Sequence, residues 1–99
     1  MLSKFRTYQL ALKLYEKCEA INVGHLRDQL LRASSSIVLN LAEGSAKSSI
    51  KDRKRYYSIA LGSLREVQAI LDLKKNANLF QETNHLGACL YKLSRKHEP

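Results

Sequence analysis

A dense group of basic side chains stands in the middle of the chain. Residues 44 to 57 contain five Lys or Arg residues and one acid, Asp52, so this stretch carries half of the net charge of +8. Phosphates of a nucleic acid, RNA in the first place or DNA, are the expected partner of such a cluster. No base-reading element accompanies it, so the expected contacts are with the phosphate backbone. The five candidate nucleic-acid-binding residues are Lys47, Lys51, Arg53, Lys54 and Arg55.

A helix is predicted to begin inside this basic segment, because Ser49 and Asp52 have the spacing of a capping pair. Cations in its first two turns are locally unfavourable, since a helix N-terminus is already partly positive. A bound anion would reverse this, because free backbone N–H groups and the Ser48 and Ser49 hydroxyls would point toward it. The adjacent Tyr56 or Tyr57 could stack on a base. The alternative is a solvated basic face that serves solubility, with both tyrosines packed inside.

Residues of catalytic or metal-binding type are scattered along the chain. His85 and Cys89 stand four apart on one predicted helix face, but two ligands do not complete a zinc site. No glycine-rich phosphate loop and no nucleophile with an orienting base is visible. We therefore expect no enzymatic activity, no metal and no cofactor. Cys18 and Cys89 are expected to be free thiols, since two cysteines are too few for a disulfide scaffold.

The elements that must position the basic segment are expected to be helices. The chain has one proline and four glycines, and apolar residues recur every three or four positions, as in amphipathic helices. Helices are predicted over residues 3–21, 25–43, 49–75 and 79–96, within one domain that spans residues 1–99. Short connections between them favour an all-α fold, an up-down-up-down antiparallel four-helix bundle.

The two middle helices carry more apolar residues than one buried face requires. Residues 37–42 are all apolar except Asn40, and Gly44 is interpreted as the terminator of this helix. A helix that is apolar all round is buried all round, so we expect a homo-oligomer. Asn40 is expected to hydrogen-bond to a neighbouring helix. Glu43 is expected to pair with Ser63 or with a basic residue of the third helix.

A second apolar row on the third helix supports the same expectation of an oligomer, because one row can face the subunit core and the other a neighbouring chain. The second row consists of Tyr56, Ile59, Val67, Ile70 and Leu73. No apolar stretch approaches the roughly 20 residues of a membrane span, and the first residues lack the apolar segment of a signal peptide. A cytoplasmic location without membrane contact is therefore expected.

The centre of the chain resembles a known family. The run Asn-Leu-Ala-Glu-Gly at 40–44, the basic Ser-rich turn after it and Gly-Ser-Leu-Arg-Glu at 62–66 are similar to the four-helix bundle proteins of intervening sequences in bacterial 23S rRNA genes. This resemblance is strong over residues 26–73. It implies a left-handed bundle that assembles into a homopentameric ring or barrel. The family structural motif comprises Asn40, Glu43, Gly44, Ser63 and Glu66.

The same resemblance implies kinship with the accessory variability determinant of diversity-generating retroelements, a basic pentamer that binds nucleic acid and a reverse transcriptase. We therefore expect a non-enzymatic oligomer that binds nucleic acid, with an accessory role beside a reverse transcriptase. The alternative is a protein-interaction scaffold, or a stand-alone protein without a retroelement role. The chain departs from the family in the compressed connection at residues 22–25 and in its short last helix.

Overall fold

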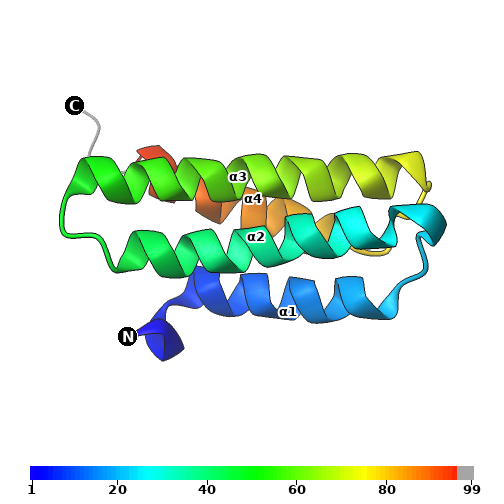
Figure 1. The fold of residues 1–99 in the computed structure, drawn as a ribbon, viewed down its shortest axis with the longest axis horizontal. Helices are drawn as coiled ribbons and strands as arrows, with labels where there is room; N and C mark the ends of the chain where they lie inside the picture. Colours follow the sequence, from blue (N-terminus) through cyan, green and yellow to red (C-terminus); the bar gives the residue numbers. More distant parts are fainter. Residues whose placement is uncertain (96–99) are drawn as a thin grey trace.

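The computed structural model describes residues 1–95, which form four α-helices and two short 3-10 helices without any strand (Figure 1). The all-α fold class is thus confirmed. No helix in this part of the chain combines the length and apolar character needed to cross a membrane. The elements are η1 (Leu2–Lys4), α1 (Arg6–Ala20), η2 (Gly24–Leu26), α2 (Arg27–Ser45), α3 (Ile50–Leu73) and α4 (Phe80–Arg95).

Each helix packs against two others, in the cyclic order α1, α2, α3, α4. In Figure 1, α2 lies between α1 and α3, and α4 lies behind them. Helices α2 and α3 run antiparallel, because Ser36 contacts Ser63 while Gly44 contacts Tyr56 and Tyr57. One apolar core joins all four helices, and its fully buried leucine and isoleucine side chains are Leu14, Leu30, Ile37, Leu41, Leu64, Leu86 and Leu90.

The observed helix ends differ from the predicted ones by one to three residues. The first predicted turn, from residue 3, is 3-10 rather than α-helical, and the fourth helix was predicted to end at residue 96, outside the described residues. The predicted cap of the third helix is confirmed, since the Asp52 backbone N–H donates to the Ser49 hydroxyl at 3.1 Å. A Ser cap of this kind satisfies a backbone donor that the helix itself leaves unpaired.

Gly44 does not terminate its helix, and that prediction is wrong. Helix α2 continues through Gly44 and ends at Ser45. A Cβ atom at position 44 would lie 2.8 Å from Cε1 of Tyr57 and 3.0 Å from Cβ of Tyr56. The residue is therefore a glycine because α2 and α3 approach closely here, and not because the backbone turns into a left-handed conformation.

The second apolar row of α3 is divided between the core and the surface. Val67 and Ile70 are buried inside the subunit, whereas Ile59 is 44% exposed and Leu73 is 70% exposed. The prediction that this whole row meets a neighbouring chain is wrong for the two buried residues. Helix α3 packs against both α2 and α4. Two of its sides are therefore buried within a single subunit.

The two cysteines are free thiols, as predicted. Cys18 is fully buried in the core and Cys89 is half-buried. Burial raises the pKa of the Cys18 thiol to about 11, against the opposing effect of a hydrogen bond with Ser34. Since the thiolate is the reactive form of cysteine, Cys18 is a packing residue at neutral pH.

Candidate nucleic-acid interface

The basic segment runs from the end of α2 through the connection into the first turns of α3, which lie next to the last turns of α4. A pocket of about 480 Å³ lies between the two helix ends. Three of the five predicted cations line it, together with the Asp52 carboxylate and three residues of α4, Tyr91, Ser94 and Arg95. We call this site the basic pocket and define it by Lys51, Lys54, Arg55, Tyr91 and Arg95.

Helix α4 supplies the residues of the basic pocket that sequence reasoning missed, Tyr91, Ser94 and Arg95. Tyr91 is 52% exposed, and the Arg95 guanidinium lies 5.3 Å from the centre of its ring. Tyr91 and Arg95 are four residues apart, which places both side chains on one face of α4. This spacing is the sequence signal that could have indicated the pair. Only the antiparallel return of α4 brings this face beside Lys51, about forty residues earlier in the chain. A cation next to an exposed ring can hold a phosphate while the ring stacks on a base.

The other two predicted cations do not line the basic pocket. The Lys47 ammonium lies 3.0 Å from a Glu43 carboxylate oxygen and 5.3 Å from the centre of the Tyr56 ring. This hydrogen bond with Glu43 is the main cause that raises the pKa of Lys47. The Arg53 side chain donates from Nε to the Lys47 carbonyl at 2.7 Å. Lys47 and Arg53 therefore brace the connection between α2 and α3.

The two tyrosines beside the basic segment have different environments. Tyr57 is buried and meets Phe5 edge to face at 6.1 Å, so it is a core residue, as the alternative interpretation held. Desolvation by burial raises the pKa of its hydroxyl, and the nearby Arg53 charge opposes this shift. Tyr56 is half-buried beneath the Arg55 guanidinium, which lies 4.7 Å from the centre of its ring. Tyr91 on α4 is thus the aromatic residue that the basic pocket itself presents.

The family motif residues lie mainly where α2 meets α3. The hydroxyls of Ser36 and Ser63 are 2.8 Å apart, and Asn40 donates from Nδ2 to the Ser36 hydroxyl at 3.1 Å and to the Ser36 carbonyl at 2.9 Å. Asn40 was predicted to hydrogen-bond to a neighbouring helix. It does so indirectly, because it bonds to Ser36 of its own helix and Ser36 bonds to Ser63 of α3. Glu66 is exposed on α3.

The expected partner of Glu43 is corrected by these contacts. Glu43 pairs with Lys47 of the α2–α3 connection, while Ser63 pairs with Ser36. Glu43 and Lys47 are four residues apart in the chain, about one helical turn. The ion pair therefore joins neighbouring turns. It stabilises the end of α2 rather than a contact between helices.

Residues of metal-ligand type do not come together in the described part of the chain. Within residues 1–95, no three His, Cys, Asp or Glu side chains are grouped as they would be around a metal ion. His85 is exposed and Cys89 is half-buried on the same helix.

The chain is thus a small all-α protein of four packed helices, with four cations lining a pocket between the start of α3 and the end of α4. A family model of the 23S rRNA-intervening sequence proteins matches residues 4–96, and the chain belongs to that family. The family resemblance of the central segment is thereby confirmed. Comparison with curated proteins and with solved structures finds no significant match. The kinship with the accessory variability determinant stays a prediction.

Proposed function

We propose that this protein is a non-enzymatic nucleic-acid-binding protein that contacts RNA phosphates through the basic pocket. The observation that carries the proposal is the convergence of Lys51, Lys54 and Arg55 with Arg95, which lies far away in the chain. These four cations outnumber the one carboxylate that lines the pocket, Asp52, and a local excess of positive charge attracts a polyanion. The exposed Tyr91 ring beside them adds a surface for a base.

Binding of the wild-type protein to RNA should be strongly salt-dependent. Four pocket cations that each neutralise one phosphate predict a slope of about −3 for log K against log salt on a single strand. Fluorescence anisotropy of a labelled RNA, titrated with the full chain between low and moderate salt, measures both affinity and slope. No binding at low salt, or an affinity indifferent to salt, would contradict the proposal.

We also propose that the subunits form left-handed up-down-up-down bundles and assemble into the homopentameric ring that the resemblance implies. The surface that supports an assembly lies along the contact between α2 and α3. Leu39 is 65% exposed and Ile59 is 44% exposed. The antiparallel register set by Ser36 and Ser63 places them at the same level on either side of that contact. Repetition of the basic pocket around a ring would multiply its affinity for a long RNA.

Charge at this surface should dissociate the assembly. The double variant Leu39→Glu, Ile59→Glu buries two carboxylates in the proposed interface, which is costly without partners. Light scattering at micromolar concentration is expected to give a pentamer for the wild type and a monomer for the variant. Leu73→Glu is the control. Leu73 is 70% exposed and belongs to the same predicted row as Ile59, but it lies about 21 Å away along α3 at the usual helical rise. The proposed interface at Leu39 and Ile59 leaves it out, so this variant should remain pentameric. A monomeric wild type would overturn the proposal.

The remaining expectations stay predictions of the resemblance and of the composition. They are the accessory role beside a reverse transcriptase, the alternative role as a protein-interaction scaffold, and the cytoplasmic location. The described surface of residues 1–95 supports phosphate binding more directly than any of them, because its pocket combines cations with an exposed ring.

A further inference from the structure

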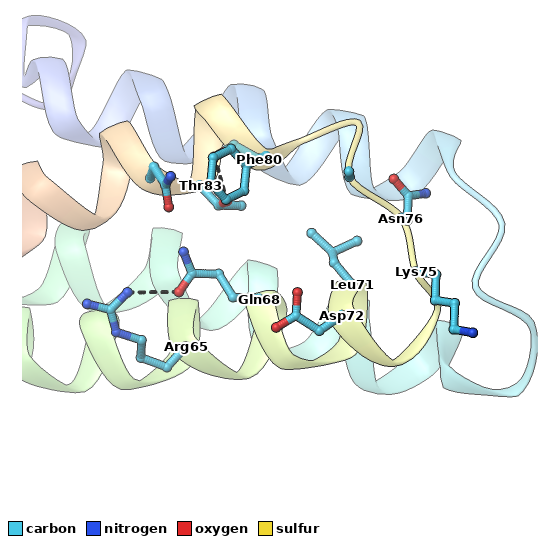
Figure 2. A pocket seen from close by; sticks show the side chains of 10 residues that line it. Arg65, Gln68, Leu71, Asp72, Lys75, Asn76, Phe80 and Thr83 are labelled. Atoms are coloured by element: carbon cyan, nitrogen blue, oxygen red, sulfur yellow. Dashed lines mark hydrogen bonds between the residues drawn. The ribbon is translucent and has the colours of Figure 1, made fainter.

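A second pocket lies at the opposite end of the contact between α3 and α4. It has a volume of about 500 Å³. Figure 2 shows Gln68 and Asp72 on α3 across from the Phe80 ring on α4, with Leu71 next to Asp72 on the side toward Asn76. The Phe80 ring is 64% exposed. We call this site the Phe80 pocket and define it by Arg65, Gln68, Asp72, Phe80 and Asn84.

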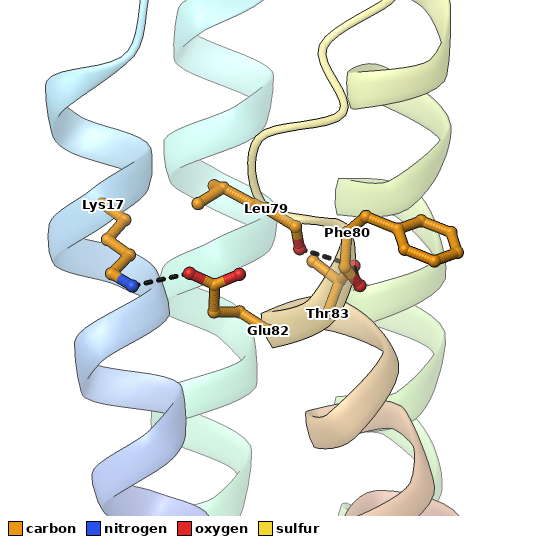
Figure 3. A network of polar contacts seen from close by, with 5 residues as sticks. All are labelled: Lys17, Leu79, Phe80, Glu82 and Thr83. Carbon is orange, nitrogen blue, oxygen red and sulfur yellow. Dashed lines mark hydrogen bonds and ion pairs between the residues drawn. The ribbon is translucent and has the colours of Figure 1, made fainter.

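The Phe80 ring is presented by a firmly anchored helix start. The Lys17 ammonium of α1 lies 2.6 Å from a Glu82 carboxylate oxygen, and Leu79 is buried in the core. The Thr83 hydroxyl donates to the carbonyls of Leu79 and Phe80, at 3.0 and 3.1 Å. In Figure 3 the Phe80 ring points away from the Lys17–Glu82 ion pair. These contacts fix the backbone that carries the ring, so a partner that stacks on Phe80 orders little more than the ring itself.

The two pockets lie along the same side of the contact between α3 and α4, which we call the α3–α4 groove. On α3 their lining residues follow at intervals of three or four, through Lys54, Ser58, Leu61, Arg65 and Gln68, and therefore share one helix face. Lys54 and Gln68 are about 21 Å apart at the usual helical rise. This length accommodates about four nucleotides, the lower end of the site sizes known for single strands.

Between the two pockets, the Arg65 side chain lies beside the buried Gly87 of α4. Gly87 of α4 lacks a side chain there, and a Cβ atom at this position would lie 3.6 Å from an Arg65 guanidinium nitrogen. The other neighbour of that Cβ would be Leu64, at 3.4 Å. Arg65 is also oriented by its hydrogen bond to the Gln68 side chain, at 2.8 Å. A strand that leaves the basic pocket thus meets a positioned guanidinium before it reaches Phe80.

The chemistry of the groove changes along its length. The basic pocket holds four cations against one carboxylate, Asp52, and therefore favours phosphates. The Phe80 pocket holds Arg65 and Lys75 against Asp72 and adds an aromatic ring and amide side chains. A base suits the Phe80 pocket instead, because the ring offers a stacking face. The Asp72 carboxylate accepts from amino groups on base edges, and the Gln68 and Asn84 amides donate and accept.

We propose that the α3–α4 groove binds single-stranded nucleic acid, with one base stacked on Phe80 and the adjoining phosphates held by Arg65 and the basic pocket. This inference rests on the proposed function and specifies that the bound nucleic acid is single-stranded. A duplex cannot use the Phe80 pocket, because its bases are stacked on each other inside the helix and present no free face.

A short RNA with one 2-aminopurine base tests this inference in the full-length protein. Stacking on Phe80 is expected to change the 2-aminopurine fluorescence when the single strand binds, and to leave it unchanged for the duplex form. Phe80→Ala should weaken single-strand binding about five- to hundredfold, because one base stack is lost. It should leave the salt slope and the duplex affinity at their wild-type values, because the phosphate contacts persist. Leu73→Ala removes an equally exposed apolar side chain outside the pocket and should change none of these quantities.

The outcomes separate this inference from the proposed function. Wild-type protein that binds no RNA at low salt overturns the proposed function and, with it, this inference. RNA binding that is unaffected by Phe80→Ala overturns the stacking inference alone and leaves Phe80 to a protein contact. An equal loss for single strand and duplex also overturns it, because a stacking contact acts on the single strand only.

Discussion

Replacing Lys54, Arg55 and Arg95 together by glutamine should lower the affinity for single-stranded RNA about ten- to hundredfold at low salt. These three side chains line one pocket from two helices, so each can neutralise a phosphate of the same strand. The salt slope should become shallower by about 2, since each lost phosphate contact on a single strand removes about 0.7. Anisotropy titrations at several salt concentrations measure both effects.

A charge-matched variant distinguishes a defined pocket from general electrostatic attraction. Lys4, Arg6 and Lys13 are exposed cations of η1 and α1, and their replacement by glutamine removes the same three charges from the net +8. Long-range attraction to RNA falls equally in both triple variants, and salt screens it beyond about 10 Å. The control should therefore retain most of the affinity and nearly all of the slope. Equal losses in the two variants would show that binding is spread over the surface.

Gly44→Ala should lower the free energy of unfolding by about 1–3 kcal/mol, the range for overpacking a well-filled core. Helix propensity alone favours alanine over glycine by about 1 kcal/mol inside a helix. The predicted loss of stability therefore comes from packing, which must outweigh this gain. The added methyl group would lie 2.8 Å from the buried Tyr57 ring and 3.0 Å from the Tyr56 Cβ atom. The second atom is fixed by the α3 backbone and cannot swing aside, so the helices themselves must separate.

Gly62→Ala is the matched control for this effect, because Gly62 is also in the interior of a helix but a Cβ there meets no atom within 4 Å. It should raise the free energy of unfolding by up to about 1 kcal/mol through helix propensity. Urea denaturation followed by circular dichroism gives both values. If the two alanine variants changed stability in the same direction, close packing at Gly44 would not be the reason for its glycine.

The number and order of the helices could be predicted because the signals for them are local. Apolar residues spaced for a helix, few breakers and the Ser49 cap each act within a few residues of the chain. Gly44 could not be placed from the same signals. A glycine near the end of an apolar run is typical of a helix terminator, and only the contact with Tyr56 and Tyr57 shows that close packing requires it.

The surface available for an oligomer depends on the same difference between local and tertiary information. The apolar rows of α2 and α3 are visible in the sequence, but burial depends on how many neighbours a helix has. Val67 and Ile70 turn out to be covered within one subunit, whereas Leu39 and Ile59 stay exposed. What supports an assembly is therefore a smaller patch than the sequence predicted.

The sequence by itself determined that this is an all-α protein of its family with its positive charge concentrated before and within the start of α3. The tertiary structure decided which of those charges share a surface. Successive helical residues point in directions about 100° apart, so Lys51, Lys54 and Arg55 can face α4 while Arg53 bonds to the Lys47 carbonyl. Tyr91, Arg95 and Phe80 joined the candidate site for a related reason: antiparallel packing brings together residues that local sequence patterns leave far apart.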